Sequence, residues 1–83
     1  MSNATVFKAD GASYELDHRP SLEEAQKICG GNIELVSVRG KTLVVDEEGL
    51  MKNKFTNPTG SQLYGGTIVG DVIVLEGWKT VGS

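Results

Sequence analysis

The sequence predicts an α+β fold in which one antiparallel-rich sheet of about five strands is packed by a single helix. Short runs rich in valine, isoleucine and leucine recur between glycine-containing turns, and only residues 21–29 have apolar residues at helical spacing. A chain of 83 residues has room for one hydrophobic core. We therefore expect a single domain over residues 1–83. Its core is expected in residues 5–77, and residues 1–4 and 78–83 are expected to fray.

The N-terminal part of the chain predicts a β-hairpin. Residues 5–9 and 13–16 are prone to form strands, and Asp10-Gly11 lies between them. This dipeptide is a strong hairpin signal, because glycine adopts the positive φ that a tight turn needs. Pro20 then interrupts the strand pattern, since proline cannot donate a hydrogen bond to a neighbouring strand.

A helix is predicted to begin at Ser21 and to end at Gly30-Gly31. Ser21 and Glu24 have the spacing of a capping box, in which each side chain bonds a backbone N–H group of the first turn. Glycine favours the left-handed conformation that commonly follows a helix. The apolar residues that share one face of this helix, and that we expect to pack on the sheet, are Leu22, Ala25, Ile28 and Cys29.

A second hairpin and a final strand complete the expected sheet. Residues 32–39 and 41–46 are rich in apolar β-formers, with Gly40 between them. The first of these strands has apolar residues in both phases, so it is either apolar on both faces or contains a bulge. Residues 67–75 are also apolar in both phases, which predicts a strand at the centre of the sheet.

Residues 47–66 lack periodicity over a length that usually indicates a function or hidden short elements. Residues 57–60, Asn-Pro-Thr-Gly, have the composition of a turn. The same segment contains three apolar residues too large for a purely solvated loop, Phe55, Leu63 and Tyr64. They either fold back as a lid on the core or form an exposed contact patch. A face that this segment leaves open could instead be covered by a second copy, as in a symmetric homodimer.

Charge and composition exclude several classes of protein. The net charge of −3 and the scattered basic residues oppose nucleic-acid binding, which usually depends on clustered lysine and arginine. A membrane-spanning helix needs about 18 consecutive apolar residues, and no apolar run in the sequence comes near that length. The N-terminus also lacks the basic and then apolar pattern of a secretory signal. With one cysteine no internal disulfide forms, which fits a reducing compartment. We therefore expect a cytoplasmic protein without a membrane partner.

The candidate chemical motifs are all weak. The acidic residues 46–48 are adjacent rather than spaced as in a calcium loop, so a solvated turn is favoured over a metal site. Residues 60–67 imitate a phosphate-binding loop, but Gly66 stands where the lysine is needed. His18 is expected at the surface without a catalytic partner, and Cys29 is expected to be a buried, inert thiol. We expect no cofactor.

Several motifs follow the first hairpin in a fixed order, namely Cys29-Gly30-Gly31, Ile33-Glu34, residues 43–50, Asn57-Pro58 and residues 68–72. The chain resembles the small proteins of bacteriophages and mobile elements catalogued as domain of unknown function thirty-eight forty-six. The family usually has an aliphatic residue where Cys29 stands, and often asparagine where Asp46 stands. The resemblance implies a phage or phage-like origin and a compact α+β domain, and it brings no known active site.

We therefore expect a small non-enzymatic phage protein of the host cytoplasm that binds a host protein or a small ligand. Host takeover or an anti-defence role is suggested by analogy only. The alternatives are a small acid-dependent or metal-dependent hydrolase and a nucleic-acid-binding or virion structural protein. No nucleophile, base and orienting group can be assigned together, which favours binding over catalysis. The residues expected to contact the ligand or partner are Glu47, Glu48, Lys52, Lys54, Asn57, Thr59 and Tyr64.

Overall fold

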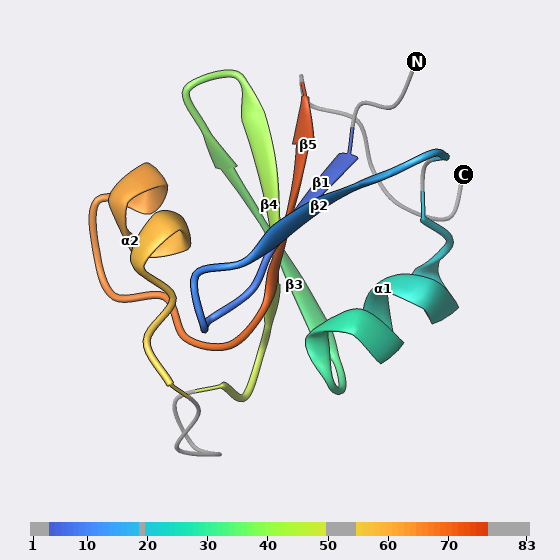
Figure 1. The fold of residues 1–83 in the computed structure, drawn as a ribbon, viewed down its shortest axis with the longest axis horizontal. Coiled ribbons are helices and arrows are strands. Elements are labelled where there is room, and N and C mark those ends of the chain that lie inside the picture. Colours follow the sequence, from blue (N-terminus) through green and yellow to red (C-terminus); the bar gives the residue numbers. More distant parts are fainter. Residues whose placement is uncertain (1–3, 19, 50–54, 77–83) are drawn as a thin grey trace.

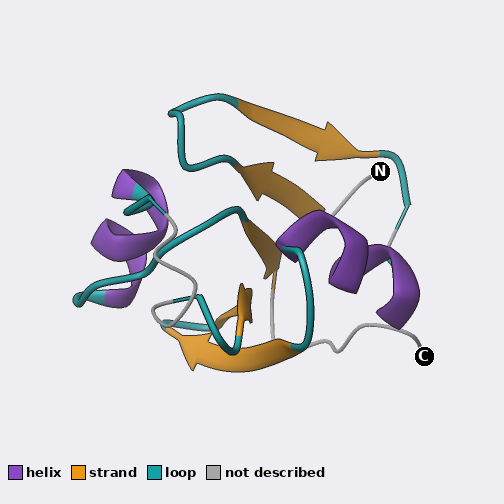
Figure 2. Ribbon diagram, turned by 90° about the horizontal axis from the view of Figure 1, so that it is seen from below, coloured by secondary structure: helices purple, strands orange, loops and turns teal. Residues whose placement is uncertain are grey.

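The computed structural model describes residues 4–18, 20–49 and 55–76. These residues form a five-stranded antiparallel sheet with the strand order β2-β1-β5-β4-β3. Two helices, α1 (Leu22–Cys29) and α2 (Pro58–Tyr64), lie on opposite sides of this sheet (Figures 1 and 2). The predicted α+β fold class is confirmed. The strands are β1 (Ala4–Phe7), β2 (Ser13–Leu16), β3 (Ile33–Val38), β4 (Lys41–Asp46) and β5 (Val72–Glu76).

The central position of the last strand is confirmed, since β5 pairs with β1 on one side and β4 on the other. Ile73 and Leu75 join the core cluster on the α1 side, while Val72 and Val74 join the cluster on the α2 side. The strand is shorter than predicted and begins at Val72. Gly70 has a positive φ of 79°, which is incompatible with a continuous strand through residues 67–75.

The helix α1 follows the sequence prediction closely at its ends. Ser21 and Glu24 form the expected capping box, and Gly30 ends the helix in the left-handed conformation. Ala25 and Cys29 are buried, and Ile28 packs against the same cluster. Leu22 differs from the prediction because it is 50% exposed. It is the first helical residue, so no preceding helical turn shields it.

The prediction of a single helix is wrong, because residues 58–64 form the second helix, α2. The expected turn at residues 57–60 is the start of this helix, with Asn57 as its N-cap and proline in its first turn. Gly65 ends it in the left-handed conformation. Pro-Thr-Gly-Ser is a poor helix-forming run, so the cap residues and the tertiary contacts of α2 outweigh its intrinsic propensity.

The second helix covers part of the sheet face opposite α1. Leu63 packs against the cluster that contains Leu43, Val72 and Val74. Of the three large apolar residues in this segment, Leu63 therefore acts as a lid, whereas Phe55 is 84% exposed and Tyr64 is 45% exposed. The lid expectation is met by Leu63, whereas contact of the exposed Phe55 and Tyr64 with a partner stays a prediction.

Strands β1 and β3 also refine the prediction. The chain enters β1 at Ala4, which is 2% exposed, although residue 4 was expected to fray. At one edge of the sheet, β3 pairs with β4 in a continuous register from Ile33 opposite Asp46 to Val38 opposite Lys41. This register contains no bulge. Of the two alternatives for this strand, the one with apolar residues on both faces is therefore correct. Neither helix in the described part of the chain has the length and apolar character needed to cross a membrane.

Candidate binding site

A pocket of about 340 Å³ lies on the α2 side of the sheet. Strand β3 contributes Glu34 and Val36, strand β4 contributes Val45 and Asp46, and the turn after β4 contributes Glu47. The opposite wall comes from the end of α2 and the segment that leads to β5, namely Tyr64, Thr67, Ile68 and Val69. The volume is near the lower end of the range for small-ligand sites, so it suits a small molecule or one side chain of a partner.

The apolar wall of the pocket is well fixed. Val45, Ile68 and Val69 are each at most 8% exposed. The Ser61 hydroxyl accepts a hydrogen bond from the Ile68 N–H group at 2.8 Å and donates one to the Ile68 carbonyl at 3.0 Å. The backbone N–H group of Asn57 donates to the same carbonyl at 2.8 Å. These bonds hold residue 68 against α2, so the pocket exists before any ligand binds.

The polar wall of the pocket is acidic. Glu34 and Glu47 are exposed, and Asp46 is buried with its Oδ1 accepting a hydrogen bond from the Glu48 N–H group at 2.9 Å. Tyr64 adds a half-exposed aromatic ring. None of the described residues that line the pocket is basic. Carboxylates beside low-dielectric apolar walls create a negative potential, and an aromatic face also attracts cations.

The structure brings together some of the residues predicted to bind a partner and separates others. Glu47 and Tyr64 both line the pocket. Glu48 is exposed in the neighbouring turn, and Thr59 is half-buried in the first turn of α2. Asn57 is fully buried and bonds backbone groups of the protein itself. Lys52 and Lys54 lie outside the described residues.

Sequence reasoning missed the contribution of β3 to the pocket. Glu34 lies directly opposite Val45 in the β3–β4 register, and Val36 lies on the same face of β3 as Glu34. The alternation of residues in the predicted hairpin contained this signal, because it places these two side chains on one face. The position of α2 on that face was the missing information, since this segment was expected to be irregular.

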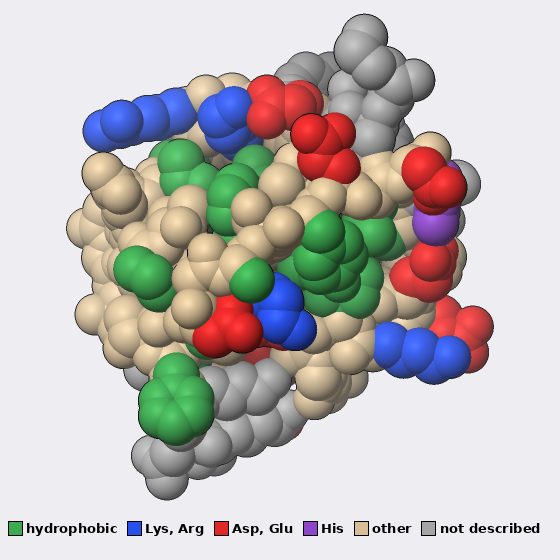
Figure 3. Space-filling model, viewed as in Figure 1, with side chains coloured by type: hydrophobic (Ala, Val, Ile, Leu, Met, Phe, Trp, Pro, Cys, Tyr) green, Lys and Arg blue, Asp and Glu red, His purple; other side chains and the backbone are tan. Residues whose placement is uncertain are grey.

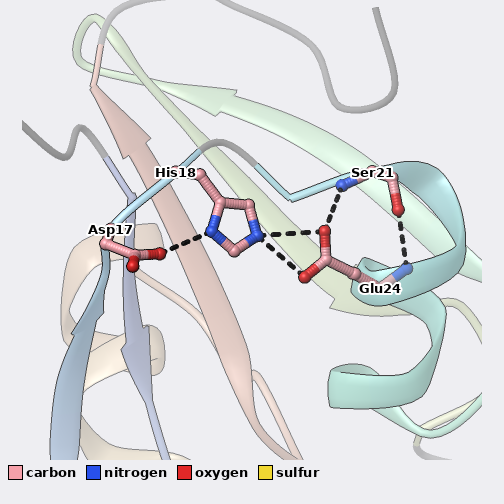
Figure 4. Close-up of polar contacts among 4 residues, drawn as sticks. All are labelled: Asp17, His18, Ser21 and Glu24. Atoms are coloured by element: carbon pink, nitrogen blue, oxygen red, sulfur yellow. Dashed lines mark hydrogen bonds and ion pairs between the residues drawn. The ribbon is translucent and has the colours of Figure 1, made fainter.

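A second polar cluster surrounds the single histidine on the α1 side of the chain (Figures 3 and 4). His18 Nδ1 lies 2.6 Å from Asp17 Oδ1, and His18 Nε2 lies 2.8 Å from Glu24 Oε2. The side chain of His18 is 53% exposed, and it lies between acidic side chains at the surface in Figure 3. The predicted surface position is confirmed, but the two carboxylate partners were not foreseen. Glu24 is held in place because its carboxylate also accepts a hydrogen bond from the Ser21 N–H group at 3.1 Å.

The carboxylates favour the charged form of this histidine. The pKa of His18 is raised above its ordinary value, first by the hydrogen bond to Asp17 and then by the hydrogen bond to Glu24. The pKa values of Asp17 and Glu24 are lowered, mainly because each accepts a hydrogen bond from His18. A ring that donates from both nitrogens has no lone pair with which to remove a proton from a substrate. This geometry suits a group of ion pairs that joins the β2–α1 connection to α1, and it does not suit a general base. We call these ion pairs of Asp17, His18 and Glu24 the ion-pair tie.

The described residues contain no group of three or more His, Cys, Asp or Glu side chains arranged to hold a metal ion. Cys29, the one cysteine of the chain, is 1% exposed, and its Sγ donates to the Val44 carbonyl oxygen at 3.5 Å. The predicted burial of this thiol is confirmed. The pocket between β3, β4 and α2 is therefore the feature that best fits a binding site.

Comparison with known proteins supports the resemblance noted from the motifs. A family model described as Domain of unknown function (DUF3846) matches residues 2–82. No curated protein and no solved structure matches the chain. The match covers both walls of the pocket and both helices.

Proposed function

Because the chain belongs to the DUF3846 family, whose description assigns no activity, we propose from the pocket geometry that it is a non-enzymatic binding protein for a positively charged group. The group is carried by a host protein or by a small molecule in the host cytoplasm. The family resemblance supports an origin in a bacteriophage or mobile element, and the genes that flank its own would test that origin.

The observation that carries this proposal is the charge pattern of the pocket. Among the nine described residues that line the pocket, Glu34, Asp46 and Glu47 are acidic, and none is a lysine, arginine or histidine. A cationic ligand would gain Coulomb attraction from Glu34 and Glu47, which are exposed and therefore accessible. An anionic ligand of the same size would meet repulsion from the same carboxylates.

The apolar wall indicates the rest of the ligand. Val36, Val45, Ile68 and Val69 lie beside the carboxylates, so a ligand with an aliphatic stem and a cationic head could satisfy both walls. The stem would bury against the valine and isoleucine side chains, while the head would stay near the carboxylates and solvent. Primary alkylammonium and alkylguanidinium groups have this shape.

Titration of the ¹⁵N-labelled protein with three probes of similar size but different charge tests the proposal. We expect n-butylguanidinium to shift the amide signals of Val36, Tyr64 and Ile68, whereas n-butanol and butyrate should have little effect at equal concentration. Removing one carboxylate by Glu34→Gln or Glu47→Gln should weaken binding about two- to fivefold, the range expected for an exposed ion pair.

Glu15→Gln is the matched control for these variants. Glu15 is an exposed glutamate on β2, the opposite edge strand of the sheet, and the described lining of the pocket does not include it. Its replacement changes the net charge by the same amount and should leave binding within about 1.5-fold. Equal shifts with butyrate and n-butylguanidinium, or equal losses in the Glu15 and Glu34 variants, would contradict a cation site in this pocket.

A further inference from the structure

The pocket lies directly beside an edge of the sheet. Strand β3 is the last strand in the order β2-β1-β5-β4-β3, and within the described residues it pairs only with β4. Its six residues continue without a bulge from Ile33 to Val38. A regular edge strand exposes a row of N–H and C=O groups that an extended peptide can bond.

The backbone geometry shows which groups of β3 point outward. Glu47 N–H donates to the Asn32 carbonyl at 2.9 Å, so residue 32 directs its backbone groups toward the β4 side. Backbone groups alternate in direction along an antiparallel strand, and the β3–β4 register is unbroken. The outward N–H and C=O groups of β3 therefore belong to Ile33, Leu35 and Ser37.

The side chains of β3 alternate in a complementary way. Glu34 and Val36 face the pocket, whereas Ile33 packs on the α1 side and Leu35, on that same side, is 42% exposed. A strand added beside β3 would place every second side chain next to Glu34 and Val36. Its remaining side chains would lie next to Leu35, where an apolar residue would bury exposed surface.

We propose that the partner is an extended peptide segment of another protein, which adds to the sheet along β3 and places a lysine or arginine side chain in the acidic pocket. This inference rests on the proposed function and specifies its partner. The segment alternates basic residues, which face the pocket, with apolar residues, which cover Leu35. Main-chain hydrogen bonds to residues 33, 35 and 37 provide affinity, and the acidic pocket provides selectivity.

Charge favours this occupant over a second copy of the chain. Two copies joined through β3 would bring two acidic pockets toward one another, because each β3 carries Glu34 at the edge of its own pocket. Like charges across a shared sheet oppose such pairing. At the other edge, β2 has four residues, and the described lining of the pocket includes none of them.

The test uses the peptide acetyl-TVKVKVT-amide and two N-methylated versions of it. Methylation of the alternate residues 2, 4 and 6 blocks one edge of the bound strand, and methylation of residues 3 and 5 blocks the other. Only one edge pairs with β3, so one methylated peptide should bind at least about tenfold more weakly than the parent. The other should bind within about twofold of the parent, since its methyl groups face away from the sheet.

Two further measurements locate the peptide. On binding of the parent peptide, the amides of Ile33, Leu35 and Ser37 should exchange with solvent more slowly, whereas those of the opposite edge strand β2 should not change. Replacing both lysines of the peptide by glutamate should reduce affinity at least about tenfold. Glu34→Gln should weaken binding of the lysine peptide, with Glu15→Gln as the control.

The outcomes separate this inference from the proposed function. If n-butylguanidinium binds in the pocket but both methylated peptides bind as well as the parent, strand addition is wrong and the cation site stands. If protection appears on β2 instead of β3, the assignment of the edge is wrong. If the glutamate peptide binds as tightly as the lysine peptide, the pocket does not select the partner by charge, and the inference is overturned.

Discussion

The side-chain amide of Asn57 donates a hydrogen bond from Nδ2 to the backbone carbonyl of Phe7 at 2.7 Å, although the two residues are 50 positions apart in the sequence. The same amide group donates to the Gly70 carbonyl at 2.8 Å, and Oδ1 accepts from the Gly60 N–H group at 2.8 Å. One fully buried side chain thus joins the end of β1, the start of α2 and the approach to β5.

Asn57→Ala should therefore destabilise the protein by about 3 kcal/mol, because it leaves buried carbonyls without a donor and removes the cap of α2. Urea unfolding followed by circular dichroism measures this change. Thr59→Ala, in the first turn of the same helix, is the control and should change stability by less than about 1 kcal/mol. A loss of under about 1 kcal/mol for Asn57→Ala would show that the asparagine is not the structural tie that its contacts indicate.

A second prediction concerns the close approach of Gly49 and Val69. A Cβ atom added at Gly49 would lie 2.6 Å from Val69 Cγ2, and the branched valine side chain cannot easily move away. Gly49→Ala should therefore destabilise the protein by about 1–3 kcal/mol. Unfolding curves of Gly49→Ala, Val69→Ala and the double variant form a double-mutant cycle.

The cycle has a defined sign. In the double variant the smaller side chain at position 69 makes room for the new methyl group, so the combined loss should be smaller than the sum of the single losses. Additive losses would show that position 49 tolerates the methyl group without contact with Val69. Because Val69 also lines the pocket, Gly49→Ala should in addition weaken binding of n-butylguanidinium.

The sequence was sufficient to predict most of the sheet. The turns at Asp10-Gly11 and Gly40 indicated the two hairpins, and the two-phase apolar pattern of residues 67–75 predicted that β5 is central. The capping box at Ser21 located the start of α1. These features depend on short-range chemistry and on periodicity, which are visible in a single sequence.

The second helix could not be predicted in the same way. Pro58–Tyr64 has low helix propensity and no apolar stripe of useful length, so its existence depends on Asn57 and on the packing of Leu63. The Asn-Pro start and the glycine after Tyr64 were cap signals that suggested a turn equally well. Because α2 forms one wall of the pocket, missing it also concealed Glu34 as a site residue.

A third prediction concerns the buried thiol. Cys29 lies between α1 and β4 with 1% exposure, so a thiol reagent reaches it only when the structure opens. We expect Cys29 to react with an aromatic disulfide reagent at least about 100-fold more slowly in the native protein than in concentrated urea. The rate is measured from the absorbance of the aromatic thiol that the reaction releases. Similar rates in both conditions would mean that α1 separates readily from the sheet.

The final prediction uses the ion-pair tie of Asp17, His18 and Glu24, whose charges depend on pH. Since the pKa of His18 is raised in the folded protein, its stabilising contribution is complete below the ordinary value of 6.5 and is lost as the pH rises through the folded pKa. The pKa values of Asp17 and Glu24 are lowered, so their contributions are present above about 4.5 and are lost as the pH falls through their folded values. The tie should therefore stabilise the protein most between about pH 4.5 and 6.5.

His18→Gln should reduce the melting temperature more at pH 5.5 than at pH 8.5, because a smaller fraction of the wild-type rings is charged at the higher pH. An NMR titration of the imidazole should give a lower pKa for His18 in Glu24→Gln than in the wild type, because one stabilising carboxylate is lost. Glu23→Gln removes a neighbouring charge in the first turn of α1 and should leave the pKa of His18 nearly unchanged. Since all three side chains are exposed to solvent, and Asp17 almost completely, salt should reduce the difference between His18→Gln and the wild type. A variant that is equally destabilised at both pH values would show that His18 stabilises this connection by packing and not by charge.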